Sequence, residues 1–343
     1  MLQEKVSEYM EQRMKKKEVK KKFKKTIFGV IAFWVVVESM ELISDFLYPQ
    51  NDIIRNWQSF YALEENSVDI LIVGSSHAYS SFNPEILGEN LGQQAYVLAS
   101  SSQNVTQTYF NVKEAIKYQK PEMLILETFG IDNNNNWQGE NEETPDKNWK
   151  KESNIDGMRL GIVKLEAIAE QYLPENWCYA LFKIARCHGN WKDTQLIMSN
   201  YDFFKNGIDQ YSGFRPSESV MSEETMKQYE EMAETHSEYK ICEENETYYH
   251  KLAQLCRENE MKLYMIMAPM YDGYIKKINY ESRYQQIAAL AQSEGVEYLD
   301  CNKLYDEIGL DATDFEDAFN SYHHLNRQGA DKVTTYVAEV LKK

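Results

Sequence analysis

A short stretch of small polar residues has the types and position expected of a nucleophile. Gly74-Ser75-Ser76-His77 directly follows the apolar run from Val68 to Val73, which has the composition of a parallel strand buried on both faces. Open α/β sheets bind ligands at the carboxyl ends of their strands, where the amides of the next turn can hold an anion. Ser76 is therefore a candidate nucleophile. The competing interpretation is an ordinary turn, for which small residues are also typical.

A second group of reactive side chains lies near the C-terminus. Asp314-Phe315-Glu316-Asp317 is followed by His323-His324-Leu325-Asn326 and then by an amphipathic helical pattern over 327–342. An imidazole can take the proton of a serine hydroxyl, and a carboxylate can orient that imidazole. The two groups can do chemistry together only if the fold brings them into contact.

With Gly74-Ser75-Ser76 early and His324-Leu325-Asn326 late, the chain resembles the SGNH (GDSL-like) superfamily of hydrolases and acyltransferases. The resemblance covers residues 66–130 and 245–343. It implies acyl transfer with Ser76 as nucleophile and His324 as general base. His323 is the alternative base, although His-Leu-Asn is the usual context in the family.

The acid of the triad is less regular in this sequence. The family usually has Asp three residues before the histidine, but Ser321 stands there. The Asp-Phe-x-Asp pattern that contains Asp317 also resembles the family, so Asp317 is the predicted acid, with four extra residues before His324. The alternative is a Ser–His dyad held by Asn320 or by a backbone carbonyl.

The oxyanion donors are predicted from the second loop, Ala99 to Asn104, which follows an apolar run. In the family this loop supplies a donor, usually through Gly, and the resemblance points to Ser102 and Gln103. An N-cap role for these polar residues is the simpler interpretation. The family's Gly-x-Asn-Asp block is replaced here by Glu127-Thr128-Phe129, so the oxyanion hole is expected to differ.

Strand and helix patterns alternate on either side of a long irregular region. Strands are expected at 68–73, 95–98, 121–127, 262–267 and 296–300, with helices between them. This order predicts a three-layer α/β/α domain over 66–343 with a five-stranded parallel sheet. Residues 132–244 are expected to form a helical insertion or cap. Its indoles could stack on a sugar, although tryptophans are more often core residues; they are Trp137, Trp149, Trp177 and Trp191.

The N-terminal 48 residues have the pattern of a membrane anchor. Residues 1–25 contain ten Lys or Arg and four Glu, and residues 26–48 are apolar enough and long enough to span a bilayer. Without a cleavage motif this is predicted to be an uncleaved signal anchor, with residues 1–25 cytoplasmic and the domain outside the cell membrane. A helix lying on the membrane surface is the alternative. Glu38 and Glu41 are predicted to face a partner membrane protein.

Composition excludes several other functions. Subtracting the +6 of residues 1–25 from the total of −17 leaves −23 on the rest, which disfavours nucleic acid binding. The five cysteines are odd in number and lack paired spacing, so no disulfide framework is expected. No pattern predicts a metal or another cofactor.

Three functions are compatible with these observations. The resemblance implies an O-acyltransferase acting on a cell-surface glycan or similar polymer beside a multi-pass membrane acyltransferase. An esterase would use the same acyl-enzyme with water as the acceptor. A binding or scaffold module without catalysis is the third possibility, because the acid is displaced and the Asn block is missing.

Overall fold

The computed structural model describes residues 2–49, 52–131, 154–206, 212–319 and 323–342. The chain divides into two units. One comprises Met1–Gln50 with Phe182–Lys205, and the other comprises Asn51–Leu181 with Asn206–Lys343. We call them the anchor unit and the sheet unit and describe each by itself. The predicted insertion at 132–244 is therefore shared between the two units.

The sheet unit contains five parallel strands, as predicted. They are β1 (Ile70–Gly74), β2 (Ala95–Ala99), β3 (Met123–Glu127), β4 (Lys262–Met267) and β5 (Glu297–Asp300), in the order β2-β1-β3-β4-β5. The chain moves outward from β1 in one direction to β2 and in the other to β3. Doubly wound sheets bind ligands at the carboxyl ends of the strands beside such a switch point.

Side chains of β1 alternate between two apolar layers. Ile70 and Ile72 enter one cluster, and Leu71 and Val73 enter the other; all four are fully buried. Burial of each such side chain is worth about 1.5–3 kcal/mol. Because both faces are covered, the strand needs a continuous apolar run, which made it recognisable in the sequence.

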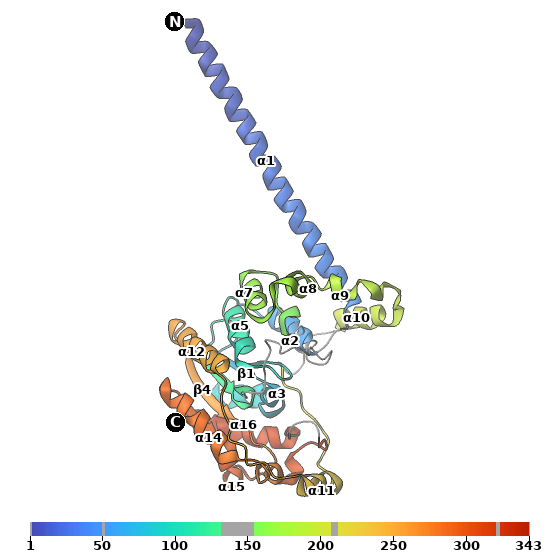
Figure 1. Ribbon diagram of the computed structural model, residues 1–343, viewed down its shortest axis with the longest axis vertical. Helices are drawn as coiled ribbons and strands as arrows, with labels where there is room; N and C mark the ends of the chain where they lie inside the picture. The colour runs from blue at the N-terminus through green and yellow to red at the C-terminus, as the bar shows by residue number, and fades with distance from the viewer. Residues whose placement is uncertain (1, 50–51, 132–153, 207–211, 320–322, 343) are drawn as a thin grey trace. The chain divides into compact units, whose positions relative to one another are not determined.

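Helices cover both faces of the sheet, which confirms the three-layer prediction (Figure 1). One face packs against α2 (Asp52–Tyr61), α5 (Val105–Ala115), α12 (Glu243–Glu258) and α14 (Tyr280–Ser293). The other packs against α3 (Ser76–Ser81), α4 (Pro84–Leu91), α11 (Glu223–Glu231) and α16 (Arg327–Leu341). The described part of this unit also contains α7 (Ile162–Gln171), α8 (Trp177–Leu181), α13 (Asp272–Ile275) and α15 (Tyr305–Ile308).

The anchor unit is built around one long helix, α1 (Leu2–Leu47). Its segment Met14–Leu47 contains a stretch of mean hydropathy 1.9, of which only 6% is buried, so it is long and apolar enough to cross a membrane. This segment covers all but the last residue of the predicted anchor at 26–48. Helices α9 (Ile184–Cys187) and α10 (Thr194–Asn206) belong to the same unit.

The two acidic residues of the predicted anchor have different surroundings. Glu41 forms an ion pair with Lys183, whose Nζ lies 3.3 Å from its carboxylate, whereas Glu38 is exposed. Lys183 also pairs with Asp45 at 2.5 Å. Contact of Glu38 and Glu41 with another membrane protein stays a prediction, but Glu41 already has a cationic partner within its own chain.

Candidate active site

Ser76 is the first residue of α3 and lies directly beyond the carboxyl end of β1. The turn is tight: Gly74 has φ +147°, and a Cβ there would lie 2.9 Å from the backbone oxygen of Glu127. Only glycine fits this backbone conformation and this close approach. Ser75 is the N-cap of α3, because its side chain accepts a hydrogen bond from the His77 amide. The local sequence thus lifts Ser76 out of the strand and into a helical turn.

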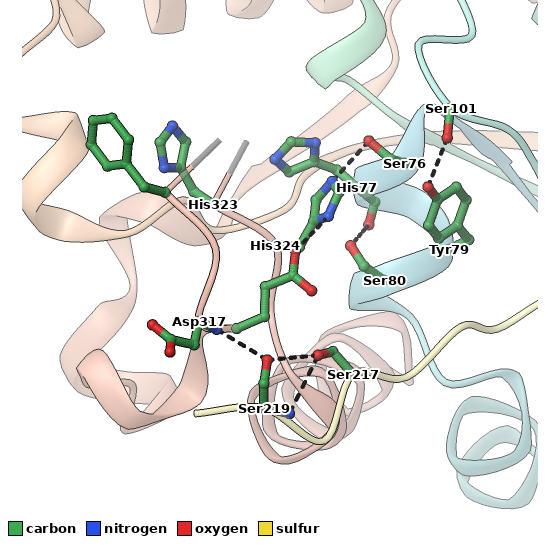
Figure 2. Close-up of polar contacts among 12 residues, drawn as sticks. Ser76, His77, Tyr79, Ser80, Ser101, Ser217, Ser219, Asp317, His323 and His324 are labelled. Carbon is green, nitrogen blue, oxygen red and sulfur yellow. Dashed lines mark hydrogen bonds and ion pairs between the residues drawn. The ribbon is translucent and has the colours of Figure 1, made fainter. Parts of the chain in front are cut away.

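The structure brings Ser76 and His324 together, although 248 positions separate them in the sequence (Figure 2). The distance from Ser76 Oγ to His324 Nε2 is 2.8 Å, and His324 Nδ1 lies 3.0 Å from Glu316 Oε1. A carboxylate can only accept, so Nδ1 carries the ring proton and Nε2 of the neutral ring accepts from Ser76. This is the geometry of a nucleophile, a base and an orienting acid.

The pairing of two short backbone segments explains why Glu316 faces His324. Phe315 and Leu325 form an antiparallel bridge, and the Glu316 amide donates to the His324 carbonyl at 3.0 Å. Side chains alternate across such a pair. Phe315 and Leu325 are therefore buried together in the core, whereas the next residues, Glu316 and His324, share the opposite face.

The prediction of Asp317 as the triad acid was wrong in position by one residue. Its carboxylate accepts hydrogen bonds from Ser222 at 2.8 Å and Thr225 at 2.6 Å, at the start of α11. These bonds lower the pKa of Asp317. Figure 2 shows its side chain pointing away from His324, as backbone alternation requires. Asp317 holds the His loop against α11, and Glu316 occupies the place that the sequence assigned to Asp317.

His323 is buried in a separate aromatic pocket. Its ring stacks on Tyr274 at 3.7 Å, and its Nδ1 lies 2.6 Å from the Tyr229 hydroxyl. Burial, with a smaller contribution from His324, lowers the pKa of His323 to about 3, so the ring is neutral at physiological pH. The structure thus favours His324 over His323 as base. Asn320 and Ser321, which belong to the alternative assignments, lie outside the described residues.

A segment from the predicted insertion supports the His loop. The amide of Met221 donates to the Phe315 carbonyl at 2.9 Å, and that of Arg327 donates to Ser217 at 2.8 Å. Asn326 caps α16 with its side-chain oxygen and donates from Nδ2 to the carbonyls of Thr313 and Ser219. The asparagine of His-Leu-Asn therefore has a structural explanation: it ties the His loop to the final helix.

The five parallel strands, the serine directly after β1 and the histidine shortly before α16 agree with the arrangement that the sequence resemblance implied. The sheet unit has a three-layer α/β/α fold. No protein-family model matches the sequence, and no curated protein does. Among solved structures, it is similar to one described as a lipolytic protein of the G-D-S-L family from Desulfitobacterium hafniense DCB-2, at 11% identity and a TM-score of 0.35. That match covers 80% of this chain and 99% of the other, and at this TM-score it carries no weight for function.

The amides at the start of α3 are used unequally. Those of His77 and Ala78 donate to Ser75, to its hydroxyl and its carbonyl respectively. Among the described residues, the amide of Ser76 meets no acceptor. One backbone donor beside the Ser76 hydroxyl is therefore left for a ligand. The sequence had suggested that several amides of this turn would be available.

Of the two predicted oxyanion residues, Gln103 is placed elsewhere. Its side chain is fully buried, donates to Thr108 at 2.9 Å and accepts from Ser100 and Asn111. With both ends engaged, it supports the second loop and cannot reach substrate. Ser102 has φ +55°, the conformation in which glycine is usual, and so corresponds in backbone to the glycine of the family.

This second loop also contacts the nucleophile helix. The hydroxyls of Tyr79, on α3, and Ser101, in the loop, are 2.9 Å apart (Figure 2). The Tyr79 ring lies 6.3 Å from that of His324, so it forms one wall beside the base. Sequence analysis missed Tyr79, although its spacing of three from Ser76 on a helix could have suggested it.

A buried carboxylate lies beneath the nucleophile. Glu127, at the end of β3, accepts from Ser75 Oγ at 3.2 Å and from the Phe129 amide at 2.9 Å. Its burial raises its pKa to about 7. His77 stacks on the Phe129 ring at 3.7 Å. The residues that replace the Gly-x-Asn-Asp block thus brace the turn that carries Ser76.

The cysteines and the tryptophans considered in the sequence form no catalytic arrangement among the described residues. All five cysteines are free thiols, and the described residues contain no cluster of His, Cys, Asp or Glu suited to a metal. Trp177 and Trp191 are exposed, with Trp177 bonded to the Tyr172 carbonyl. Trp137 and Trp149 lie outside the described residues.

Glu127 should make stability depend on pH. Its pKa is raised in the folded state, so the folded protein binds the proton more tightly and loses this advantage as pH rises from about 4.5 to about 7. We expect Glu127→Gln to remove this dependence. The free energy of unfolding of both proteins is measured in urea at pH 5, 6, 7 and 8. The stability of the wild type relative to the variant should fall as pH rises, by at most about 3 kcal/mol. A constant difference would contradict the assignment.

Proposed function

We propose that the protein is a serine-dependent acyl-transfer enzyme that forms an acyl ester on Ser76. The observation that supports this is the continuous hydrogen-bonded series Ser76, His324 and Glu316, assembled from the two ends of the sheet unit. A structural role alone would not require an acid, a base and a hydroxyl at these distances. The series therefore favours catalysis over the alternative of a scaffold without activity.

The chemistry follows from the positions of the protons. His324 Nε2 takes the proton of Ser76 as Oγ attacks the carbonyl carbon of an ester or thioester. Glu316 holds Nδ1–H and stabilises the charged imidazole that results. His324 then gives the proton to the leaving oxygen or sulfur. In the second half, an acceptor hydroxyl gives its proton to His324 and attacks the acyl carbon. The bond between that carbon and Ser76 Oγ then breaks, and His324 returns the proton to Oγ.

The oxyanion of each tetrahedral intermediate needs donors close to Ser76. The Ser76 amide is one donor, because the described residues offer it no acceptor. The loop of Ser102 is the second source, since it lies beside β1 and contacts α3 through Tyr79. A donor of this kind contributes about 2.7–4 kcal/mol to a transition state.

The finer proposal is an O-acyltransferase or esterase that acts outside the cell membrane on a cell-surface glycan or similar polymer. Its support is the apolar part of α1, which follows a lysine-rich segment of the same helix, together with the family resemblance of the sequence. A polymer acceptor and a multi-pass acyltransferase partner belong to this proposal. Water as acceptor gives the esterase version.

The nucleophile and base can be tested with a fluorophosphonate probe. We expect the full-length protein to be labelled, Ser76→Ala not to be labelled, and His324→Ala to react at least about 100-fold more slowly. His323→Gln is the matched control and should retain most of the rate, because His323 contacts Tyr229 and not Ser76. Labelling of Ser76→Ala at the wild-type rate would refute the proposal.

The two neighbouring acids provide a sharp pair of variants. Glu316→Gln should lower the rate of ester hydrolysis by about 10²–10⁴-fold, because the amide can no longer hold the imidazole in the productive tautomer. Asp317→Asn should change the rate by less than about threefold and should mainly lower thermal stability. Activity is measured with p-nitrophenyl acetate and stability by differential scanning fluorimetry. The reverse order would restore Asp317 as the acid.

The acceptor can be identified from how the acyl-enzyme divides its acyl group between water and a glycan hydroxyl. We expect a soluble glycan with free hydroxyls to divert acyl groups from water, giving acylated glycan while total turnover of the ester stays equal or rises. Mass spectrometry of the glycan and titration of the released acid follow both products, with Ser76→Ala as control. Release of acid alone at every glycan concentration would favour the esterase.

A further inference from the structure

Residues 182–205, which we call the collar, are fastened to the C-terminal end of α1. The last carbonyls of a helix have no partner within it. Here Asn190 donates to the Leu47 carbonyl at 3.0 Å, and Asn200 donates to the carbonyls of Phe46 and Tyr48 at 2.9 Å each. The collar is therefore fixed at one level along α1.

The collar binds α1 close to the end of the segment that is long enough to span a bilayer. The apolar run begins at Thr26, and 21 residues at 1.5 Å each bring the helix to Leu47 after about 32 Å, close to the thickness of the hydrocarbon layer. If α1 crosses a bilayer, the carbonyls bound by Asn190 and Asn200 lie where the hydrocarbon meets the head groups.

The collar also supplies a positive charge to the acidic residues at this end of α1. Lys183, whose side chain is only 6% exposed, is paired with both Glu41 and Asp45. Unpaired carboxylates close to hydrocarbon are costly. With a cation supplied from the collar, these two acids need no second protein to tolerate the membrane boundary.

Three large apolar or aromatic side chains are exposed on the surface of the collar, among polar ones. Trp191, Met198 and Tyr201 are 63%, 58% and 52% exposed. Met198 and Tyr201 are three residues apart on α10 and share one face, and Lys192 lies over the Trp191 ring at 4.8 Å. Tryptophan and tyrosine prefer the head-group layer, where lysine meets lipid phosphates.

We propose that the collar inserts Trp191, Met198 and Tyr201 into the head-group layer of the bilayer that α1 crosses. The occupant of this surface is lipid, because the surface lies at the end of the spanning length and combines apolar, aromatic and cationic side chains. The proposal rests on α1 spanning a membrane and does not depend on the chemistry of Ser76. It makes the collar a second membrane attachment, which limits rotation and tilt of the anchor unit.

Photocrosslinking of the full-length protein in liposomes of phosphatidylethanolamine and phosphatidylglycerol tests this. p-Benzoylphenylalanine replaces Met198 or Tyr201 in the test variants and Ser199, an exposed residue on another side of the same helix, in the matched control. Val35, which is exposed in the middle of the span, reports on the anchor itself. Lipid adducts are counted by mass spectrometry.

We expect at least tenfold more lipid adduct at 198 and 201 than at 199. Equal yields on the two faces, with adducts present at position 35, would overturn the proposal. Adducts at 198 and 201 that contain a second copy of the chain instead of lipid would overturn it as well. Absence of lipid adducts at position 35 would remove its premise, while leaving the Ser76 chemistry untouched.

Discussion

The site depends on one antiparallel contact between two pieces of irregular chain. The bridge between Phe315 and Leu325 buries two apolar side chains and thereby forces Glu316 and His324 to the other face. Moving the pairing by one residue would send the imidazole into the core and the acid away from it. The hydrophobic effect therefore enforces the polar geometry: the burial of Phe315 and Leu325 decides which of two adjacent acids meets the base.

The nucleophile Ser76 is held by a tight turn whose backbone is closely packed and has little conformational freedom. Gly74 passes within contact distance of Glu127. Ser75 donates to that carboxylate and accepts hydrogen bonds from the amides of His77 and Ala78. Burial of a carboxyl group is unfavourable for its charged form, so Glu127 retains its proton to higher pH than usual. The same carboxyl oxygens accept hydrogen bonds from β1's turn and from Phe129, which joins the carboxyl ends of the two strands beside the switch point.

The region that breaks the strand and helix alternation serves two units. Its residues 217–221 contribute backbone hydrogen bonds to the His loop, and Ser222 and Thr225 engage Asp317. Its residues 182–205 contribute the asparagines and the lysine that bind the end of α1. An interpretation of this region as a single cap is therefore too simple, because neighbouring parts of it have unrelated structural partners.

The sequence by itself indicated the five strands and the apolar helix, because continuous apolar runs are local signals. Its resemblance to a known family pointed to Ser76 and His324. Only the tertiary structure decided that Glu316 and not Asp317 faces His324, that Gln103 supports its own loop, and that Lys183 neutralises Glu41. The Asp317–Thr225 and Lys183–Glu41 contacts join residues far apart in the chain, and the contacts of Glu316 and Gln103 depend on how their loops fold. The type of a residue shows which chemistry its side chain can do. The direction in which that side chain points depends on which neighbouring side chains are buried in the core.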